Sequence, residues 1–173
     1  MAQLSLFESA HENALMVRDV RGHYRPATPE QVLTAARAIV DQTVRGDTPF
    51  TTPAVVKDYV RVKLGGLEHE VFAALFLNAQ NQLIEYVELF RGTLTQSTVY
   101  PREVVKEALA RNAAALIIAH NHPSGSVKPS TADRQLTDKL HETLALVDVR
   151  LLDHILVAGN KTVSFRESGV FLL

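Results

Sequence analysis

The feature that most constrains the fold is a run of six apolar residues, Ala114 to Ala119, that ends directly at His120-Asn121-His122. A short, continuous apolar run is typical of a strand that is buried on both faces. Side chains two residues apart in a strand leave the same face, so the two imidazoles can converge on one ion. The junction therefore predicts a buried strand that carries two metal-ligating histidines at its end.

An oxygen ligand follows in the same segment, because Asp133 lies eleven residues after His122. Two histidines and one carboxylate leave the fourth position of a tetrahedral metal open for water, as in catalytic zinc sites. We therefore predict one metal ion per chain, bound by His120, His122 and Asp133, at a site suited to hydrolysis.

A purely structural interpretation exists for part of this motif. Residues 123–129 have the Pro, Ser and Gly content of a loop, and Ser130 to Asp133 has the S-x-x-D pattern of a helix start. Ser130 would then be an N-cap and Asp133 an acid favoured by the helix dipole. The two interpretations are compatible, since a capped first turn would hold the Asp133 carboxylate rigidly toward the loop.

Caps and hydrophobic patterning predict a mixed α/β fold, with a sheet flanked by helices. Helices are expected over 28–45, 53–65, 101–112 and 131–146, and strands over 71–78, 83–90, near 97–99, 114–119, 147–157 and 162–165. The predicted organisation is a flexible tail over 1–27, an N-terminal helix over 28–50 and a domain over 51–173. The first two helices are expected to form a lid or docking layer.

The H-x-H-P-x6-S-x2-D motif resembles the JAMM signature of the MPN/JAB metallopeptidase family, and the chain is most similar to its bacterial RadC-like branch. Further matching segments are 78–83, Phe90-Arg91-Gly92-Thr93, Tyr100-Pro101-Arg102-Glu103 and Leu152-Asp153-His154. The resemblance covers roughly 52–173 and implies the MPN/JAB fold, a cytidine-deaminase-like sheet flanked by helices. The helix-hairpin-helix region of longer RadC proteins is not expected in the fifty residues before it.

The resemblance also implies roles for individual residues. His120, His122 and Asp133 would be the zinc ligands, and Ser130 would donate to the developing oxyanion. The catalytic glutamate of the family matches Glu70, with Glu68 as the competitor two residues earlier. Glu70 is favoured because it directly precedes the apolar run 71–77. The implied reaction is hydrolysis of a peptide, isopeptide or related amide bond by activated water, with Glu70 as general base and then general acid.

Composition narrows the alternatives. The chain has no cysteine, which excludes thiolate metal sites and the C-x-x-C pair of a zinc deaminase. A formal net charge of −1 without clustered basic residues argues against direct nucleic-acid binding, and it disfavours a metal-dependent nuclease. No signal peptide or membrane-length apolar run is present, so a cytoplasmic location is expected.

The N-terminal pentapeptide Gln3-Leu4-Ser5-Leu6-Phe7 resembles the motif by which bacterial polymerases and repair proteins bind the DNA sliding clamp. Leu6 and Phe7 would fill an apolar pocket on the clamp. The alternative function is therefore a replication or repair accessory module, tethered to the clamp, in which zinc is largely structural.

A second polar pair, Asp153-His154, lies within the strand expected over 147–157. A polar pair in a strand is usually a hydrogen-bonded structural group, and it can also support a metal ligand from behind. Direct ligation of a metal by this pair is not expected.

Overall fold

A computed structural model describes residues 14–44, 50, 52–92 and 99–171. The chain divides into two compact units, Met1–Ile39 and Val40–Leu173. Helix α1 (Pro29–Val44) runs from the first unit into the second, close to the helix predicted over 28–45.

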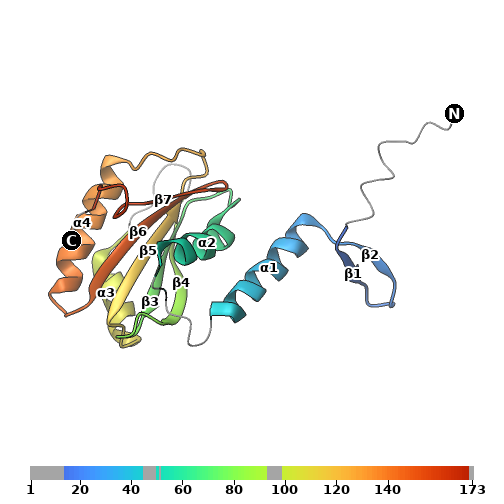
Figure 1. Cartoon of the computed structure of the whole chain (residues 1–173), viewed down its shortest axis with the longest axis horizontal. Helices are drawn as coiled ribbons and strands as arrows, with labels where there is room; N and C mark the ends of the chain where they lie inside the picture. Colours follow the sequence, from blue (N-terminus) through green and yellow to red (C-terminus); the bar gives the residue numbers. More distant parts are fainter. Residues whose placement is uncertain (1–13, 45–49, 51, 93–98, 172–173) are drawn as a thin grey trace. The chain divides into compact units, whose positions relative to one another are not determined.

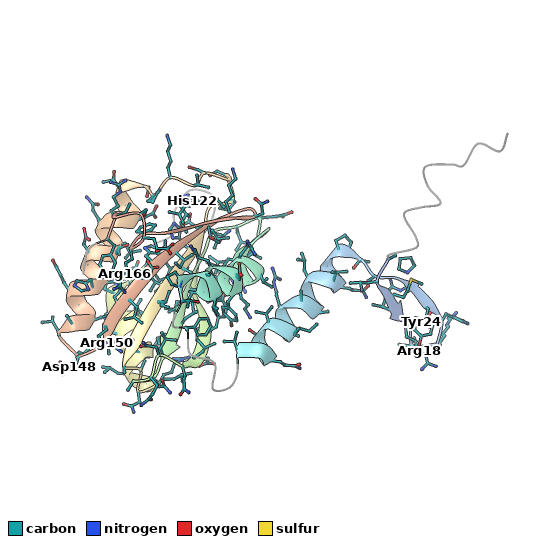
Figure 2. The ribbon with its side chains drawn as sticks, in the orientation of Figure 1. Arg18, Tyr24, His122, Asp148, Arg150 and Arg166 are labelled. Carbon is teal, nitrogen blue, oxygen red and sulfur yellow. The ribbon has the colours of Figure 1, made fainter. Side chains whose placement is uncertain are left out.

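The first unit contains a small antiparallel hairpin of β1 (Met16–Arg18) and β2 (Tyr24–Pro26), in which Arg18 lies opposite Tyr24 (Figure 2). The flexible tail predicted over 1–27 includes this hairpin, and residues 1–13 of that range lie outside the described residues. The turn of the hairpin is closed by Asp19, whose carboxylate accepts the backbone N–H groups of Arg21 and His23. Such Asx-type turn chemistry stabilises a hairpin without an apolar pattern to reveal it.

The second unit is built on a five-stranded mixed sheet. Its strands are β3 (Val71–Leu77), β4 (Leu83–Arg91), β5 (Ala115–Asn121), β6 (Arg150–Ala158) and β7 (Lys161–Ser164), in the order β4-β3-β5-β6-β7. Only the β5–β6 pair is parallel, and every other neighbouring pair is antiparallel. β5 is therefore the central strand of the sheet, and all seven of its residues are buried.

Helices cover both faces of this sheet (Figure 1). α2 (Pro53–Leu64) packs on one face, and α3 (Pro101–Ala110) and α4 (Thr131–Ala145) pack on the other. Successive side chains of β5 point to opposite faces of the sheet. Ala115, Ile117 and Ala119 join the cluster under α2, whereas Leu116 and Ile118 join the cluster under α3 and α4. The predicted mixed α/β fold is confirmed.

The first two helices were predicted to form a lid or docking layer. α2 is not a lid, because it buries Val56, Tyr59, Val60 and Leu64 in the core. A helix with four buried residues is a structural layer of the domain, because exposing that surface would cost the free energy of its burial.

The remaining elements agree with prediction to within a few residues, including the turn between β6 and β7 at Gly159 and Asn160. The short strand expected near 97–99 lies mostly outside the described residues, as does the Gln3 to Phe7 motif. None of the described helices has the length and apolar character needed to cross a membrane. The cytoplasmic location stays a prediction.

Candidate metal centre

The predicted histidine ligands lie at the C-terminal end of β5. His120 belongs to β5, and His122 follows it with its backbone N–H donated to Val157 O of β6 (2.8 Å). The two imidazoles share one side of the strand, with ring centroids 4.8 Å apart. Figure 2 shows His122 at this end of the sheet, with Arg150 at the opposite end of β6. His120 is buried and His122 is partly exposed, so the pair lies at the edge of the core.

Asp133 is brought to the histidines by the first turn of α4. Ser130 is the N-cap of this helix, and its Oγ accepts the backbone N–H of Asp133 (3.1 Å). The Asp133 carboxylate in return accepts the backbone N–H of Ser130 (2.7 Å), which completes a capping box. The structural interpretation of Ser130 and Asp133 is thus confirmed, and the same cap fixes the carboxylate beside the histidines.

The three side chains have the spacing of ligands around one ion. His120 Nε2 lies 3.1 Å from His122 Nε2 and 3.4 Å from Asp133 Oδ1, and His122 Nε2 lies 3.5 Å from Asp133 Oδ2. Ligand atoms about 2.0–2.1 Å from one tetrahedral ion would be separated by about 3.3 Å. His120, His122 and Asp133 are the one group of this kind found among the described residues, and it could hold a metal ion.

The proton positions around His122 also suit a metal. His122 Nδ1 lies 3.0 Å from the carbonyl oxygen of Ser126, which can only accept a hydrogen bond. Nδ1 must therefore carry a proton, so in the neutral imidazole Nε2 presents a lone pair to the other ligand atoms. A second contact that fixes the orientation of a ligating histidine is typical of metal sites.

The electrostatics of the cluster favour a positive charge between the three side chains. Burial alone would raise the pKa of the Asp133 carboxyl, but the contacts of this carboxylate with the imidazoles of His120 and His122 hold its pKa far below the usual range. The hydrogen bond to Asp133 likewise raises the pKa of His122, against the effect of burial. A proton or a metal cation at this position therefore stabilises the arrangement.

Glu70 faces the histidine pair from the neighbouring strand. Phe72 of β3 pairs with His120, so the antiparallel register carries Glu70, just before β3, opposite His122. Its negative charge is close enough to contribute to the raised pKa of His122. Glu70 is partly buried, whereas Glu68 is exposed in a bend of the chain. This geometry favours Glu70 over Glu68 as the acid-base group.

Asn121 connects the two strands and was missed by sequence analysis, which treated it only as the spacer of the H-x-H motif. Its buried side-chain amide accepts the backbone N–H of Val71 (2.8 Å) and donates to the carbonyl oxygen of His69 (3.0 Å). These two backbone groups flank Glu70. Asn121 therefore holds the backbone on both sides of Glu70 against the strand that carries the histidines.

Asp153 and His154 have separate structural roles. Asp153 accepts hydrogen bonds from the Ser164 hydroxyl and from the backbone N–H groups of His154 and Arg166, so it ties β6 to β7. Burial raises the pKa of the Asp153 carboxyl, although these hydrogen bonds oppose the shift. His154 instead contacts the metal-ligand candidate His120, with Nε2 2.7 Å from His120 Nδ1. Burial, followed by the electrostatic effect of the neighbouring His120, holds the pKa of His154 well below its usual range.

Comparison with known proteins decides the family. Residues 50–170 match the family model of the RadC-like JAB domain. The chain belongs to this family. The match spans the sheet, α2 to α4 and the whole candidate metal centre, so the resemblance stated from the sequence is confirmed. The observed five-stranded sheet with helices on both faces agrees with the JAB/MPN fold.

Similar proteins are found in several bacteria. A UPF0758 protein of Thiobacillus denitrificans is 53% identical over 148 residues, covering 86% of this chain and 66% of its own length. A UPF0758 protein of Leptothrix cholodnii is 60% identical over 136 residues, covering 79% and 61%. One of Vibrio cholerae is 58% identical over 135 residues, covering 78% and 85%. The chain thus spans less than two thirds of the first two relatives, and their name states no activity.

Replacing Asn121 tests its connecting role. We expect Asn121→Ala to lower the free energy of unfolding by about 1–3 kcal/mol, because the buried backbone N–H of Val71 and the partly buried carbonyl of His69 lose their partner. Urea denaturation followed by circular dichroism measures the change. Gln135→Ala, on the exposed side of α4, is the control and should stay within about 0.5 kcal/mol of wild type. An Asn121→Ala protein as stable as this control would contradict the assignment.

Proposed function

We propose that this chain is a zinc-dependent hydrolase that cleaves a peptide, isopeptide or related amide bond. The observation that carries the proposal is the convergence of His120, His122 and Asp133 beside Glu70. Three protein ligands with an acid-base group next to them are the components of a hydrolytic metal site. Membership of the RadC-like JAB domain family supports the same chemistry at the level of the family.

The donor set indicates zinc as the ion. Two imidazole nitrogens and one carboxylate oxygen are ligands that zinc accepts, and a set of three leaves one coordination position open. When bound, zinc would supply Lewis acidity, which makes water a nucleophile near neutral pH and polarises a carbonyl group.

The acid-base step is assigned to Glu70. Its carboxylate would accept a proton from the attacking water and then donate that proton to the leaving nitrogen. For both transfers the carboxylate must stay beside the metal ligands throughout the reaction. The hydrogen bonds of Asn121 to the backbone on either side of Glu70 meet this requirement.

Ser130 would stabilise the oxyanion of the tetrahedral intermediate. Its Oγ already accepts the backbone N–H of Asp133, which leaves the hydroxyl proton able to donate. Because Ser130 is exposed at the start of α4, a substrate carbonyl can reach it. One such donor contributes up to about 3 kcal/mol to catalysis at comparable sites.

A second proposal concerns the N-terminal segment. We infer that Gln3, Leu4, Ser5, Leu6 and Phe7 bind the bacterial sliding clamp and bring the domain to replicating or repaired DNA. The pentapeptide supports this inference by its resemblance to clamp-binding motifs. The nearly neutral charge of the chain is consistent with a protein that works near DNA through a partner and does not bind nucleic acid itself.

Metal content tests the first proposal. Protein purified without an affinity tag should contain about one zinc per chain by elemental analysis. A variant with His120→Ala, His122→Ala and Asp133→Ala should contain none while it keeps its circular dichroism spectrum. His23→Ala, in the N-terminal hairpin, is the control and should keep the metal. A wild-type protein that is folded, metal-free and unable to take up added zinc would contradict the hydrolase proposal.

Glu70→Gln separates catalysis from metal binding. We expect this variant to bind zinc like wild type and to lose at least about 100-fold in hydrolysis rate, because the amide cannot accept the proton. The measurement uses zinc-loaded protein and a pooled set of internally quenched peptides and lysine isopeptides. Glu68→Gln, with its side chain exposed two residues earlier, should keep the wild-type rate. Equal rates for Glu70→Gln and wild type would overturn the assignment, and no cleavage by wild type would favour the accessory module.

Clamp binding is tested on the full chain with a purified bacterial sliding clamp. We expect Leu6→Ala with Phe7→Ala to weaken binding at least tenfold in calorimetry, because the two apolar anchors are removed. His11→Ala, outside the pentapeptide, should bind like wild type. Indistinguishable affinities for the wild-type protein and the double variant would argue against the motif.

A further inference from the structure

A buried chain of hydrogen bonds lies behind the candidate metal ligand His120, and its proton positions can be assigned from the structure. The chain begins at Thr137, which follows Asp133 by one turn of α4. Thr137 Oγ1 lies 2.6 Å from the backbone carbonyl oxygen of Asp133. A carbonyl oxygen only accepts, so the single hydroxyl proton of Thr137 is donated to it.

The next link joins Thr137 to His154. Thr137 Oγ1 lies 2.6 Å from His154 Nδ1, and a contact this short between two polar atoms needs a proton. The hydroxyl proton already points to the Asp133 carbonyl, so the proton in this link belongs to His154 Nδ1. His154 is fully buried, and a buried imidazole with no carboxylate in contact is neutral. Its other nitrogen, Nε2, is therefore an acceptor.

The last link reaches the metal ligand. His154 Nε2 lies 2.7 Å from His120 Nδ1, so His120 Nδ1 carries the proton of this contact. The neutral His120 ring then has its lone pair on Nε2. That is the atom that faces His122 Nε2 and Asp133 Oδ1 in the candidate metal centre.

Aromatic rings hold this arrangement and leave little room for water to replace it. The ring of His154 packs against Phe165, with centroids 4.3 Å apart, and makes an edge contact with Phe72 at 6.1 Å. All three side chains are at most 2% exposed. With the ring held between two aromatic side chains, the partner of Nδ1 decides which nitrogen of His154 carries the proton.

We propose that Thr137 and His154 are positioning residues that fix the tautomer of His120, so that its Nε2 lone pair is available to a metal ion. This inference rests on the proposed metal-dependent function and adds two residues to its machinery. Helix α4 then contributes to two of the candidate metal ligands. Asp133 in its first turn supplies a carboxylate directly, and Thr137, one turn later, fixes the tautomer of His120 through His154.

The experiment compares Thr137→Val with Thr137→Ser. Valine keeps the shape of threonine but has no hydroxyl, so His154 can move its proton to Nε2, and His120 must then protonate its own Nε2 to avoid a clash of donors. Serine keeps the hydroxyl. We expect Thr137→Val to bind zinc about 10–100-fold more weakly than wild type, and Thr137→Ser to bind it much like wild type. Competition with a fluorescent zinc chelator measures the affinities, and circular dichroism checks the fold.

A second measurement needs no variant. Long-range proton–nitrogen correlation spectra of metal-free wild type, labelled with nitrogen-15 at histidine, report which ring nitrogen carries the proton. We expect the Nδ1 tautomer for both His120 and His154, and a change of His154 to the Nε2 tautomer in Thr137→Val. An Nε2 tautomer for His154 in wild type would overturn the proposal even if the variants failed to fold.

The zinc affinities distinguish loss of the positioning role from absence of the metal site. If wild type binds zinc and Thr137→Val binds it equally tightly, the positioning role is wrong while the metal site stands. If wild type binds no zinc, the proposed function is wrong, and the role of Thr137 and His154 toward a metal is lost with it, whatever the spectra show.

Discussion

The hydrogen bonding of β5 on both of its edges is the constraint on which the rest of the structure depends. β5 pairs antiparallel with β3 and parallel with β6, so neither its position nor its register can shift alone. Because side chains alternate between faces, this register turns Leu116, Ile118 and His120 toward α3 and α4. A slip of one residue would turn His120 toward α2, where no carboxylate of the α4 cap could meet it. Core packing and metal-ligand geometry are thus specified by the same pairing.

Much of the candidate metal centre could be predicted from sequence because its main parts are local. The H-x-H spacing needs only an extended backbone, and the link from Ser130 to Asp133 needs only a helix start. Both conditions are visible as an apolar run before His120 and a capping pattern before α4. The role of Glu70 was implied by the family resemblance, and its position directly before the apolar residues of β3 favoured it over Glu68. The strand that pairs with β3 could not be identified from residue spacing.

The side-chain contacts that could not be predicted join distant segments of the chain. His154 lies 34 residues after His120, and its place beside that ligand follows from the parallel pairing of β5 and β6, which includes a register shift between Leu116 and Ile117. No residue spacing encodes such a pairing. Asn121 looked like a spacer because its function is to bind the backbone of another strand. Thr137 did leave a signal, since a hydroxyl among the inward-facing residues of α4 needs a buried partner.

The first turn of α4 explains why the candidate site can be rigid although it is assembled from three segments. Asp133 is held by the Ser130 cap through its carboxylate and backbone N–H, and it receives the Thr137 hydroxyl on its carbonyl. The ligand therefore has almost no freedom left once the helix forms. The arrangement has an energetic cost, because the Nε2 lone pairs of His120 and His122 face each other at 3.1 Å and face the Asp133 carboxylate at 3.4 and 3.5 Å. A cation removes that repulsion, and a ligand that binds only the folded state stabilises it. Formation of the first turn of α4 therefore both orders the metal-ligand candidates and creates the affinity for a cation.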